Sequence, residues 1–354
     1  MKYIVVLIVF GLLLSNSCEK EKPVLHPVDH NPYYRFMWYN VENLFDTLNN
    51  PDKQDDDFTP DGECHWNTER YIDKLNKINR VIHAVGGDSL PVLIGLAEVE
   101  NRLVLEDLLS KTTLNGRGYR IVHHESPDYR GIDVALLYRS PFFRLLSTKF
   151  YPIWFPFDTT VRTREILYVK GVLGDLDTLH IFLNHWPSRS GGEFHSRPRR
   201  IFVAEFLKSR TDSIFRADSQ ARVVITGDFN DEPQDLSIVS GLHAGLQFDN
   251  PQPAVLYDLT GYLETVTSTG SYKYKGDWNF LDQFIVSGTL LDTLRPVYSR
   301  VTDHQVYQSY FLMERDESYL GSKPYRTYLG SYYHGGYSDH LPVFLNLRYH
   351  EHEE

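Results

Sequence analysis

The feature that most constrains the fold is a repeated pattern in which a short apolar run ends directly in polar residues. Residues 222–227 are rich in β-branched side chains that do not alternate with polar ones, which predicts a buried strand ending at a glycine. Asp228 and Asn230 follow at the end of this strand. Two other runs end in the same way: residues 91–97 precede Glu98, and residues 179–183 precede Asn184 and His185. Side chains at strand ends are fixed by a rigid sheet and still reach solvent, so the pattern predicts a ligand site in an α/β fold.

The rest of the chain shows a mixture of strand and helix signals. Residues 70–85 carry apolar side chains every three or four positions, which indicates an amphipathic helix. Shorter helices are predicted over residues 102–109 and 200–208. Strands are predicted over residues 33–41, 91–97, 119–123, 133–138, 167–172, 178–184, 223–226, 284–286 and 341–347. This order favours two mixed sheets flanked by helices.

Composition and charge narrow the class of protein. The chain has 354 residues, of which 42% are hydrophobic and 23% charged, enough to bury a large core. No linker rich in serine, glycine or proline interrupts it, so we expect one domain over residues 33–349. The formal net charge of −11 argues against a broad basic face that grips duplex nucleic acid. A nuclease is not excluded, because carboxylates around a divalent cation make a site locally acidic.

Residues 1–18 have the pattern of an export signal. One lysine precedes an apolar stretch over residues 3–14, and small polar residues then lead to Cys18. This placement resembles a bacterial lipoprotein signal, although Leu14 lies four residues before the cysteine rather than three. We expect an exported protein that Cys18 anchors to a membrane of the cell envelope, at the outer membrane or the periplasmic face. A plain cleaved signal is the alternative, and residues 19–32 are predicted to be a tether.

Several residues at the predicted strand ends suit phosphoester cleavage, which needs an oriented water, a cation and stabilisation of the leaving oxygen. Glu98 and Asp339 are candidate ligands for Mg²⁺, which prefers oxygen ligands; Mn²⁺ and Ca²⁺ stay open. His185 and His340 each follow a polar residue at a strand edge, which suits a general acid or a cation facing the transition state. Asp133 is a possible orienter. Taken singly, each of these residues is more often structural, so the prediction depends on their combination.

The ordered set of motifs around Asn40, Glu98, His185, Asp228 and His340 resembles the endonuclease/exonuclease/phosphatase superfamily, of the deoxyribonuclease I-like kind. The resemblance covers roughly residues 33–349 and rests mainly on the Gly-Asp-Phe-Asn and Ser-Asp-His motifs. It implies a four-layer α/β sandwich of two mixed sheets flanked by helices. It also implies a metal-dependent enzyme that acts on phosphoesters.

The resemblance further implies a role for each motif in turn. Asn40 would contact the phosphate or a metal-bound water, and Glu98 would bind the metal. Asp228 would activate or orient the attacking water, and Asn230 would hold the phosphate.

The C-terminal motifs carry over in the same way. His340 would stabilise the pentacovalent phosphate, and Asp339 would orient His340 or share the metal. His185 resembles the first catalytic histidine of the deoxyribonuclease branch, with Asp133 as its acidic partner. Asp282 resembles a late catalytic aspartate, although the usual Arg-Ile-Asp form is absent.

Arginine and aromatic residues surround the predicted site in sequence. Arg189 and Arg130 are candidates to clamp an anionic substrate and Asn184 to contact it, with solvated loop positions as the alternative. Tyrosines between residues 325 and 337 either stack on bases or form an ordinary surface. Residues 152–157 form an aromatic loop that either touches lipid or packs over a sheet edge.

The favoured hypothesis is an exported, Mg²⁺-dependent nuclease that cleaves phosphodiesters by attack of a water that Asp228 orients. The alternative within the same class is a phosphatase or phosphodiesterase acting on inositol phosphates or sphingomyelin-like lipids. A non-catalytic binding lipoprotein is the hypothesis from another class. The expected partners are nucleic acid or another phosphoester, and a membrane through Cys18; no protein partner is inferred.

Overall fold

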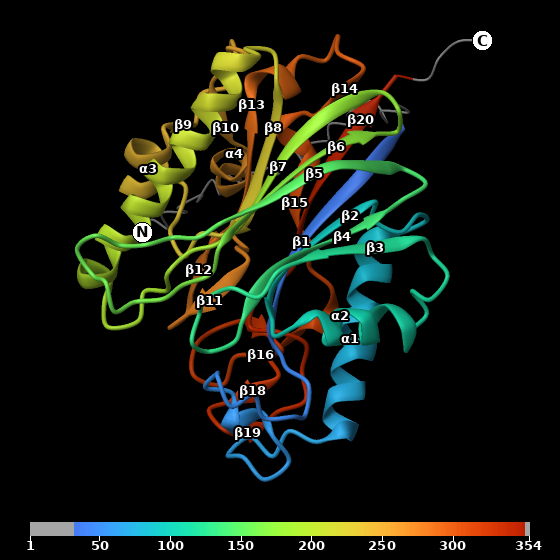
Figure 1. Ribbon diagram of the computed structural model, residues 1–354, viewed down its shortest axis with the longest axis vertical. Coiled ribbons are helices and arrows are strands. Elements are labelled where there is room, and N and C mark those ends of the chain that lie inside the picture. The colour runs from blue at the N-terminus through green and yellow to red at the C-terminus, as the bar shows by residue number, and fades with distance from the viewer. Residues whose placement is uncertain (1–31, 351–354) are drawn as a thin grey trace, which may run out of the picture. The chain divides into compact units, whose positions relative to one another are not determined.

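The computed structural model describes residues 32–350, which lie in a compact unit that begins at Pro32. Two mixed β-sheets pack face to face, and helices cover their outer faces (Figure 1). The predicted four-layer α/β sandwich is therefore confirmed. The predicted signal peptide, Cys18 and nearly all of the predicted tether lie outside the described residues. Within residues 32–350, no helix has the length and apolar character needed to cross a bilayer.

Each sheet has seven strands in the described part of the chain. Sheet A has the order β14-β20-β1-β2-β4-β3, with β15 also paired to β20. Its strands are β1 (Tyr33–Leu44), β2 (Leu93–Val99), β3 (Tyr119–His123), β4 (Asp133–Arg139), β14 (Val297–Tyr298), β15 (His304–Val306) and β20 (Val343–Tyr349). Sheet B has the order β5-β6-β7-β8-β13-β10-β9. Its strands are β5 (Phe143–Tyr151), β6 (Ile166–Leu173), β7 (Asp177–His185), β8 (Arg222–Asp228), β9 (Ala244–Gly245), β10 (Leu256–Asp258) and β13 (Asp282–Ser287).

The helices bury one face each against these sheets. α1 (Thr68–Gly86) and α2 (Arg102–Ser110) cover sheet A, and α3 (Glu193–Ala217) covers sheet B (Figure 1). α4 (Leu259–Val266) packs against β13. Three small hairpins pair β11 (Tyr272–Tyr274) with β12 (Asp277–Asn279), β16 (Met313–Arg315) with β17 (Ser322–Pro324), and β18 (Tyr328–Leu329) with β19 (Tyr332–Tyr333). Short helical turns cover Asp56–Phe58, Ser237–Leu242, Gly288–Leu291, Val301–Asp303 and Tyr310–Leu312.

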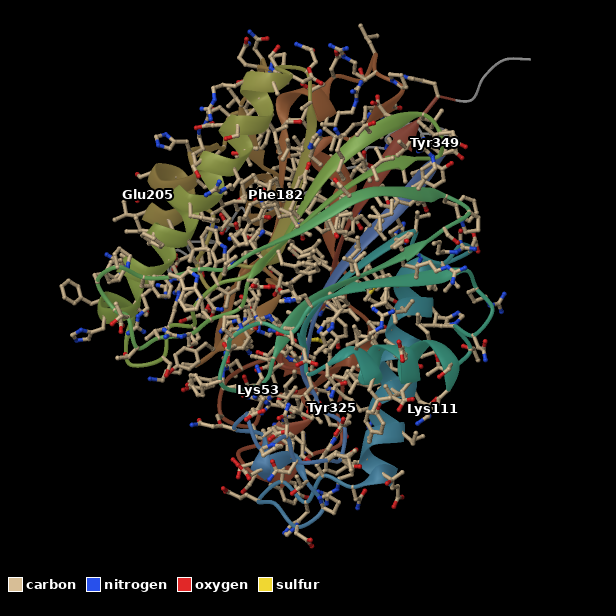
Figure 2. The ribbon with its side chains drawn as sticks, in the orientation of Figure 1. Lys53, Lys111, Phe182, Glu205, Tyr325 and Tyr349 are labelled. Atoms are coloured by element: carbon tan, nitrogen blue, oxygen red, sulfur yellow. The ribbon has the colours of Figure 1, made fainter. Side chains whose placement is uncertain are left out.

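Strands buried on both faces explain the continuous apolar runs in the sequence. In β1, Phe36 and Trp38 point into the core between the sheets, and Met37 points to the core beneath α1. In β7, Leu183 points into the core between the sheets, and Phe182 packs under α3. Figure 2 shows Phe182 within the molecule and Glu205 on the outer side of α3.

Two elements differ from the sequence prediction. α3 begins at Glu193 and ends at Ala217, well beyond the predicted residues 200–208. Its first turns are polar and contain Pro198, and the buried Arg200 interrupts the apolar stripe, so periodicity detects only the middle. β5 was not predicted, because it is an edge strand with a largely exposed sequence and has no apolar run.

Parallel pairing within each sheet brings the polar strand ends to one edge of the sandwich. β1 runs parallel to β2, with Asn40 opposite Ala97, and β7 runs parallel to β8, with His185 opposite Asp228. The close approach of β7 and β8 requires Gly227, because a Cβ there would lie 2.3 Å from the carbonyl oxygen of Asn184. The carboxyl ends of these four strands therefore meet, as the recurring motif predicts.

Candidate active site

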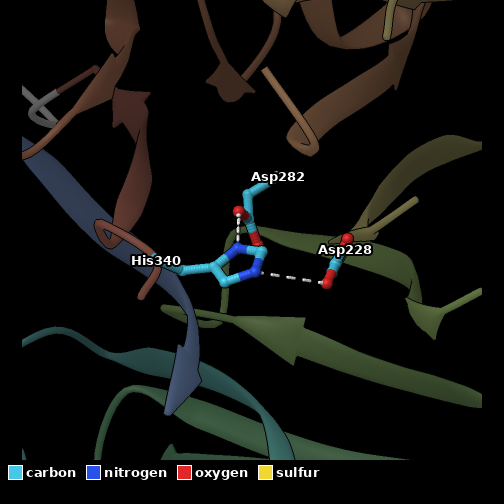
Figure 3. A group of neighbouring side chains, drawn as sticks. All are labelled: Asp228, Asp282 and His340. Carbon is cyan, nitrogen blue, oxygen red and sulfur yellow. Dashed lines mark hydrogen bonds and ion pairs between the residues drawn. The ribbon is translucent and has the colours of Figure 1, made fainter. Parts of the chain in front are cut away.

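The centre of the site is a buried group of two aspartates and one histidine, shown in Figure 3. Asp228 ends β8, Asp282 begins the neighbouring β13 directly opposite it, and His340 lies just before β20 of the other sheet. The Nδ1 of His340 is 2.6 Å from Oδ2 of Asp282, and its Nε2 is 3.7 Å from Oδ2 of Asp228. The indole Nε1–H of Trp38 donates to the other oxygen of Asp282 at 2.8 Å. Asp282 is thus held between an indole and an imidazole, and it fixes the orientation of His340.

This arrangement sets the charge of His340. Burial by itself lowers the pKa of His340, but the carboxylates of Asp282 and Asp228 outweigh burial and raise that pKa well above its usual range. The two carboxylates therefore favour the protonated, cationic form of His340. Because Nδ1 is engaged by Asp282, only Nε2–H is available to a substrate oxygen. The 3.7 Å separation from Asp228 leaves that proton without a direct short bond.

Asp228 is held by two neighbouring amides. Its Oδ2 accepts from the side-chain amide of Asn40 at 3.1 Å, and its Oδ1 accepts from the backbone N–H of Asn230 at 3.0 Å. Burial raises the pKa of Asp228 to about 7, opposed by the His340 cation and reinforced by the charge of Asp282. A carboxylate with a pKa in this range can exchange a proton at neutral pH, which suits a group that positions or activates water.

His185 approaches the same oxygen of Asp228 as His340, but its pKa is shifted in the opposite direction. Its Nε2 is 3.6 Å from Oδ2 of Asp228 and 3.9 Å from Oε1 of Glu98. Burial lowers the pKa of His185 well below its usual value, and the nearby cations of Arg164 and Arg130 add to this. One carboxylate therefore lies between a neutral and a protonated imidazole, an arrangement that separates the acid and base roles.

Glu98 supplies the carboxylate that sequence reasoning assigned to a metal. Its backbone is left-handed (φ 62°), as is that of Asn230 (φ 52°), an uncommon state for such residues that is concentrated at functional sites. Oε2 of Glu98 accepts from the backbone N–H of Asn43 at 3.1 Å. The carboxylate lines the cavity, and hard oxygen ligands of this kind fit Mg²⁺.

A second potential metal group is already satisfied by its own contacts. Ligand atoms of Asp228, Asp282 and His340 lie within 4.8 Å of one another. However, Asp282 uses one oxygen for His340 and the other for Trp38, so the group is a complete ion pair with its own hydrogen bonds. Glu98 is therefore the ligand that the geometry favours.

A cavity of about 550 Å³ opens onto these groups. Eight of the predicted residues line it: Glu98, Arg130, His185, Arg189, Asp228, Asn230, Asp339 and His340. The structure thus brings them together from distant parts of the sequence, as predicted.

Three predicted roles need correction. Asp133 does not contact His185: its two oxygens accept from the ring of His123 and from the backbone N–H of Ser126. The Nδ1 of His185 has no hydrogen-bond partner among residues 32–350. Asn184 is fully buried and outside the cavity, where its amide donates to the carbonyl of Thr226 and braces β7 against β8.

The third correction concerns Asp339. Asp282, not Asp339, holds the ring nitrogen of His340. Asp339 lines the cavity wall, and one of its oxygens accepts from the guanidinium of Arg326 at 3.1 Å. Arg326 also donates to Glu42 at 3.0 Å. A metal role for Asp339 stays a prediction.

The two predicted arginines both line the cavity, but their guanidinium groups differ in how many protein groups they already contact. Arg189 donates to the backbone oxygen of Asn230 at 2.7 Å and to Asp235 at 2.8 Å, so it holds the Asn230 loop in place. Arg130 contacts only Asp128 among the acidic groups of residues 32–350, at 3.4 Å. Arg130 is the freer of the two to meet a substrate phosphate.

The aromatic wall of the cavity comes from residues that the sequence analysis did not single out. The predicted tyrosines Tyr328 and Tyr337 are instead buried in the core beneath α1. Tyr272 lies over His340, with ring centroids 4.8 Å apart, and Tyr274 is 54% exposed at the cavity rim. Both belong to the β11–β12 hairpin, whose Lys275-Gly276 turn has two positive φ angles, a hairpin signature visible in the sequence.

Arg164 is a second residue that sequence reasoning missed. Its buried guanidinium donates to the backbone oxygen of His185 at 3.1 Å and to Asp128 at 2.9 Å. It therefore fixes the backbone that carries His185. A lone arginine before a strand gives no sequence signal of this kind.

Of the aromatic loop over residues 152–157, Ile153 and Phe155 are buried beneath α3. Trp154 and Phe157 stay about half exposed. The loop therefore packs over sheet B with two of its large side chains, in line with the structural alternative.

A model of the Endonuclease/Exonuclease/phosphatase family matches residues 36–349, which is most of the chain. The chain belongs to this family. The resemblance drawn from the motifs is thus confirmed, and members of the family hydrolyse phosphoesters. No curated protein sequence matches this family member.

Solved structures of the same fold lie at low sequence identity. TDP2 from D. rerio, complexed with a single-strand DNA product, has a TM-score of 0.54 and 15% identity, covering 89% of this chain and 99% of that one. Mannosyl-6-phosphatase from Bacteroides thetaiotaomicron has a TM-score of 0.55 and 15% identity, covering 89% and 100%. The human Nocturnin catalytic domain, with bound sulfate, has a TM-score of 0.54 and 17% identity, covering 91% and 97%. These structural similarities show the fold of this chain.

Proposed function

We propose that this family member is an exported, Mg²⁺-dependent phosphodiesterase, and most directly a nuclease. The observation that carries the proposal is the convergence of two imidazoles on one carboxylate at the base of the cavity. The Nε2 atoms of His185 and His340 lie 3.6 and 3.7 Å from the same oxygen of Asp228. Separations of this length leave room for a water or a phosphate oxygen among the three groups.

The proposed mechanism gives each side chain a task. Asp228, fixed by the amides of Asn40 and Asn230, orients a water for attack on phosphorus, and neutral His185 is within reach of the proton released. The Nε2–H of His340 donates to an oxygen of the phosphorus centre while the new O–P bond forms and the bond to the leaving oxygen breaks. A Mg²⁺ held by Glu98 would neutralise non-bridging oxygens.

The aromatic wall favours a nucleotide substrate over a lipid or inositol phosphate. Tyr272 and Tyr274 are two residues apart on one strand, so they present rings along the same wall. Aromatic side chains in such a place stack on bases without sequence preference. TDP2, which has the same fold, was solved with a single-strand DNA product.

A phosphatase acting on a small phosphomonoester is the second candidate. A cavity of about 550 Å³ accommodates a small phosphorylated sugar, and the mannosyl-6-phosphatase shares the fold. A non-catalytic binding protein is disfavoured, because Glu98, Asp228 and both histidines are all in place around one cavity.

The decisive experiment compares substrate classes and variants. We expect the purified protein to hydrolyse plasmid DNA, RNA or bis-p-nitrophenyl phosphate with Mg²⁺ and not with EDTA. His340→Ala and Asp228→Asn should each reduce turnover by at least about 100-fold. His124→Ala is the matched control, because that histidine is exposed, pairs with Glu165 and lies outside the cavity.

The outcomes separate the two candidates. Cleavage of nucleic acid that both variants abolish supports the nuclease proposal. Turnover confined to phosphomonoesters would replace it with the phosphatase, and no turnover of any substrate would favour a binding protein.

We also propose that the protein reaches the cell envelope as a lipoprotein anchored through Cys18. The support is the apolar stretch over residues 3–14 and the small polar residues before the cysteine. Metabolic labelling with a fatty acid should mark the wild type and not Cys18→Ser. Equal labelling of both proteins, or of neither, would contradict the anchor.

A further inference from the structure

A basic pocket of about 450 Å³ lies on the α3 side of sheet B, separate from the catalytic cavity. Its sheet wall comes from β5, β6 and β7, where Lys149 pairs in register with Tyr168, and Lys170 with His180. Its helix wall comes from the C-terminal half of α3 and includes Arg210. We call this feature the basic pocket.

The cations of the basic pocket are not neutralised by the protein. Within residues 32–350, no carboxylate lies within ion-pair distance of Lys149, Lys170 or Arg210. The Nε of Arg210 is buried and has no hydrogen-bond partner in that part of the chain. The carboxylate in the wall, that of Asp218, accepts from the backbone N–H of Gln220 at 2.8 Å. In a chain with a formal net charge of −11, this concentration of positive charge favours an anionic ligand.

The other walls of the basic pocket are aromatic. Lys149 and Arg210 lie over the ring of Tyr151, at 4.9 and 5.3 Å from its centroid. The hydroxyl of Tyr168 shares a 2.8 Å hydrogen bond with Nδ1 of His180, which leaves the other ring nitrogen free for a ligand. Cations that surround aromatic faces suit the phosphates and bases of a single strand better than the headgroups of a flat bilayer, because the site is recessed.

One strand, β7, carries a lining residue of the basic pocket and a lining residue of the catalytic cavity. His180 and His185 both lie on β7, five residues apart, which corresponds to about 17 Å. They point to opposite faces of sheet B, and Phe182 fills the core between sheet B and α3 (Figure 2). A small substrate in the cavity cannot span this distance, whereas a chain of several nucleotides is long enough to span it.

We propose that the basic pocket is a second phosphate-binding site that holds the backbone of a single-stranded nucleic acid substrate away from the catalytic cavity. This inference rests on the proposed nuclease function. It explains how an acidic protein can hold a polyanion without a broad basic face, since charge is concentrated at one recessed point.

The test measures binding and cleavage separately. Binding of a labelled single-stranded oligonucleotide of about 15 nucleotides is measured with the full chain carrying Asp228→Asn, in EDTA, so that cleavage cannot contribute. Adding Lys149→Gln and Lys170→Gln together should weaken binding about tenfold and reduce the slope of log affinity against log salt by about 1.4, since each lost phosphate contact contributes about 0.7. Lys208→Gln is the control, because Lys208 lies on α3 outside the lining of the basic pocket and pairs with Asp212.

In the otherwise wild-type protein, Lys149→Gln with Lys170→Gln should leave turnover of bis-p-nitrophenyl phosphate unchanged. Unchanged oligonucleotide affinity in that double variant would overturn the proposal. So would loss of inorganic phosphate binding alone, which would indicate a small-anion site, or loss of binding to anionic phospholipid vesicles alone, which would indicate a membrane contact. If the wild type fails to cleave phosphodiesters, the proposed function fails, and oligonucleotide binding still decides on the basic pocket.

Discussion

Replacing Asp282 by asparagine tests whether the His340 cation drives turnover. The substitution keeps the shape of the side chain and the hydrogen bond from Trp38, but removes the charge that faces Nδ1 of His340 at 2.6 Å. A hydrogen bond to a charged partner contributes about 1.5–3 kcal/mol. If this hydrogen bond stabilises the transition state, in which His340 is protonated, and not the ground state, its loss lowers kcat/KM by about 10- to 150-fold.

The pH dependence gives the stricter test. Asp282 and Asp228 raise the pKa of His340 above its usual range, so the alkaline limb of wild-type activity should reflect the loss of the His340 proton. In Asp282→Asn the alkaline limb of kcat/KM should move to lower pH. The assay is hydrolysis of bis-p-nitrophenyl phosphate over a pH series, with Trp38→Phe as the comparison that removes the indole donor and keeps the charge of Asp282. An alkaline limb that stays in place in Asp282→Asn would refute the assignment of His340 as the cation.

Three further predictions concern the metal, the fold and its pH dependence. Glu98→Gln should raise the Mg²⁺ concentration for half-maximal activity by at least about tenfold, and an unchanged titration would remove Glu98 from the metal site. Arg164→Met removes the 2.9 Å ion pair of the buried Asp128 and leaves that carboxylate only the 3.4 Å contact with Arg130. Unfolding in denaturant should therefore show a loss of up to about 3–5 kcal/mol, which a second change, Asp128→Leu, should partly restore. Burial raises the pKa of Asp258 to about 7, so its protonated form stabilises the fold fully below the unfolded pKa, and this stability is lost between about pH 4 and 7. Asp258→Asn should therefore gain up to about 4 kcal/mol over the wild type at pH 8 but only about 1.6 kcal/mol at pH 5, and equal gains at both pH values would contradict this.

Much of the architecture could be predicted because buried strands carry an unmistakable pattern. The β8 run before Asp228 and the β1 run before Asn40 are apolar on both faces, and the structure gives both as central strands. Edge elements such as β5 have no such pattern, because solvent accepts almost any side chain on their exposed face.

The sequence predicts which residues form the site, but not which of these residues contact one another. Periodicity places Asp282 and Asp339 near strand ends equally well, and only the tertiary register of β13 against β8 shows that Asp282 meets His340. Asp133 illustrates the same limit, because nothing in the sequence reveals that His123, not His185, is its partner. Aromatic clustering along the chain likewise misled, since Tyr337 fills the core while Tyr272 lies over His340.

The central hydrogen bonds of the site run between the two sheets. Trp38 and Asn40 of sheet A donate to Asp282 and Asp228 of sheet B, at 2.8 and 3.1 Å. The distance between the acids and their partners is therefore set by the thickness of the apolar layer that separates the sheets. The geometry of the active site therefore depends on how the two sheets pack. A core side chain between the sheets influences turnover without touching the substrate. If the packing of this layer loosens, the enzyme should lose activity before either sheet unfolds.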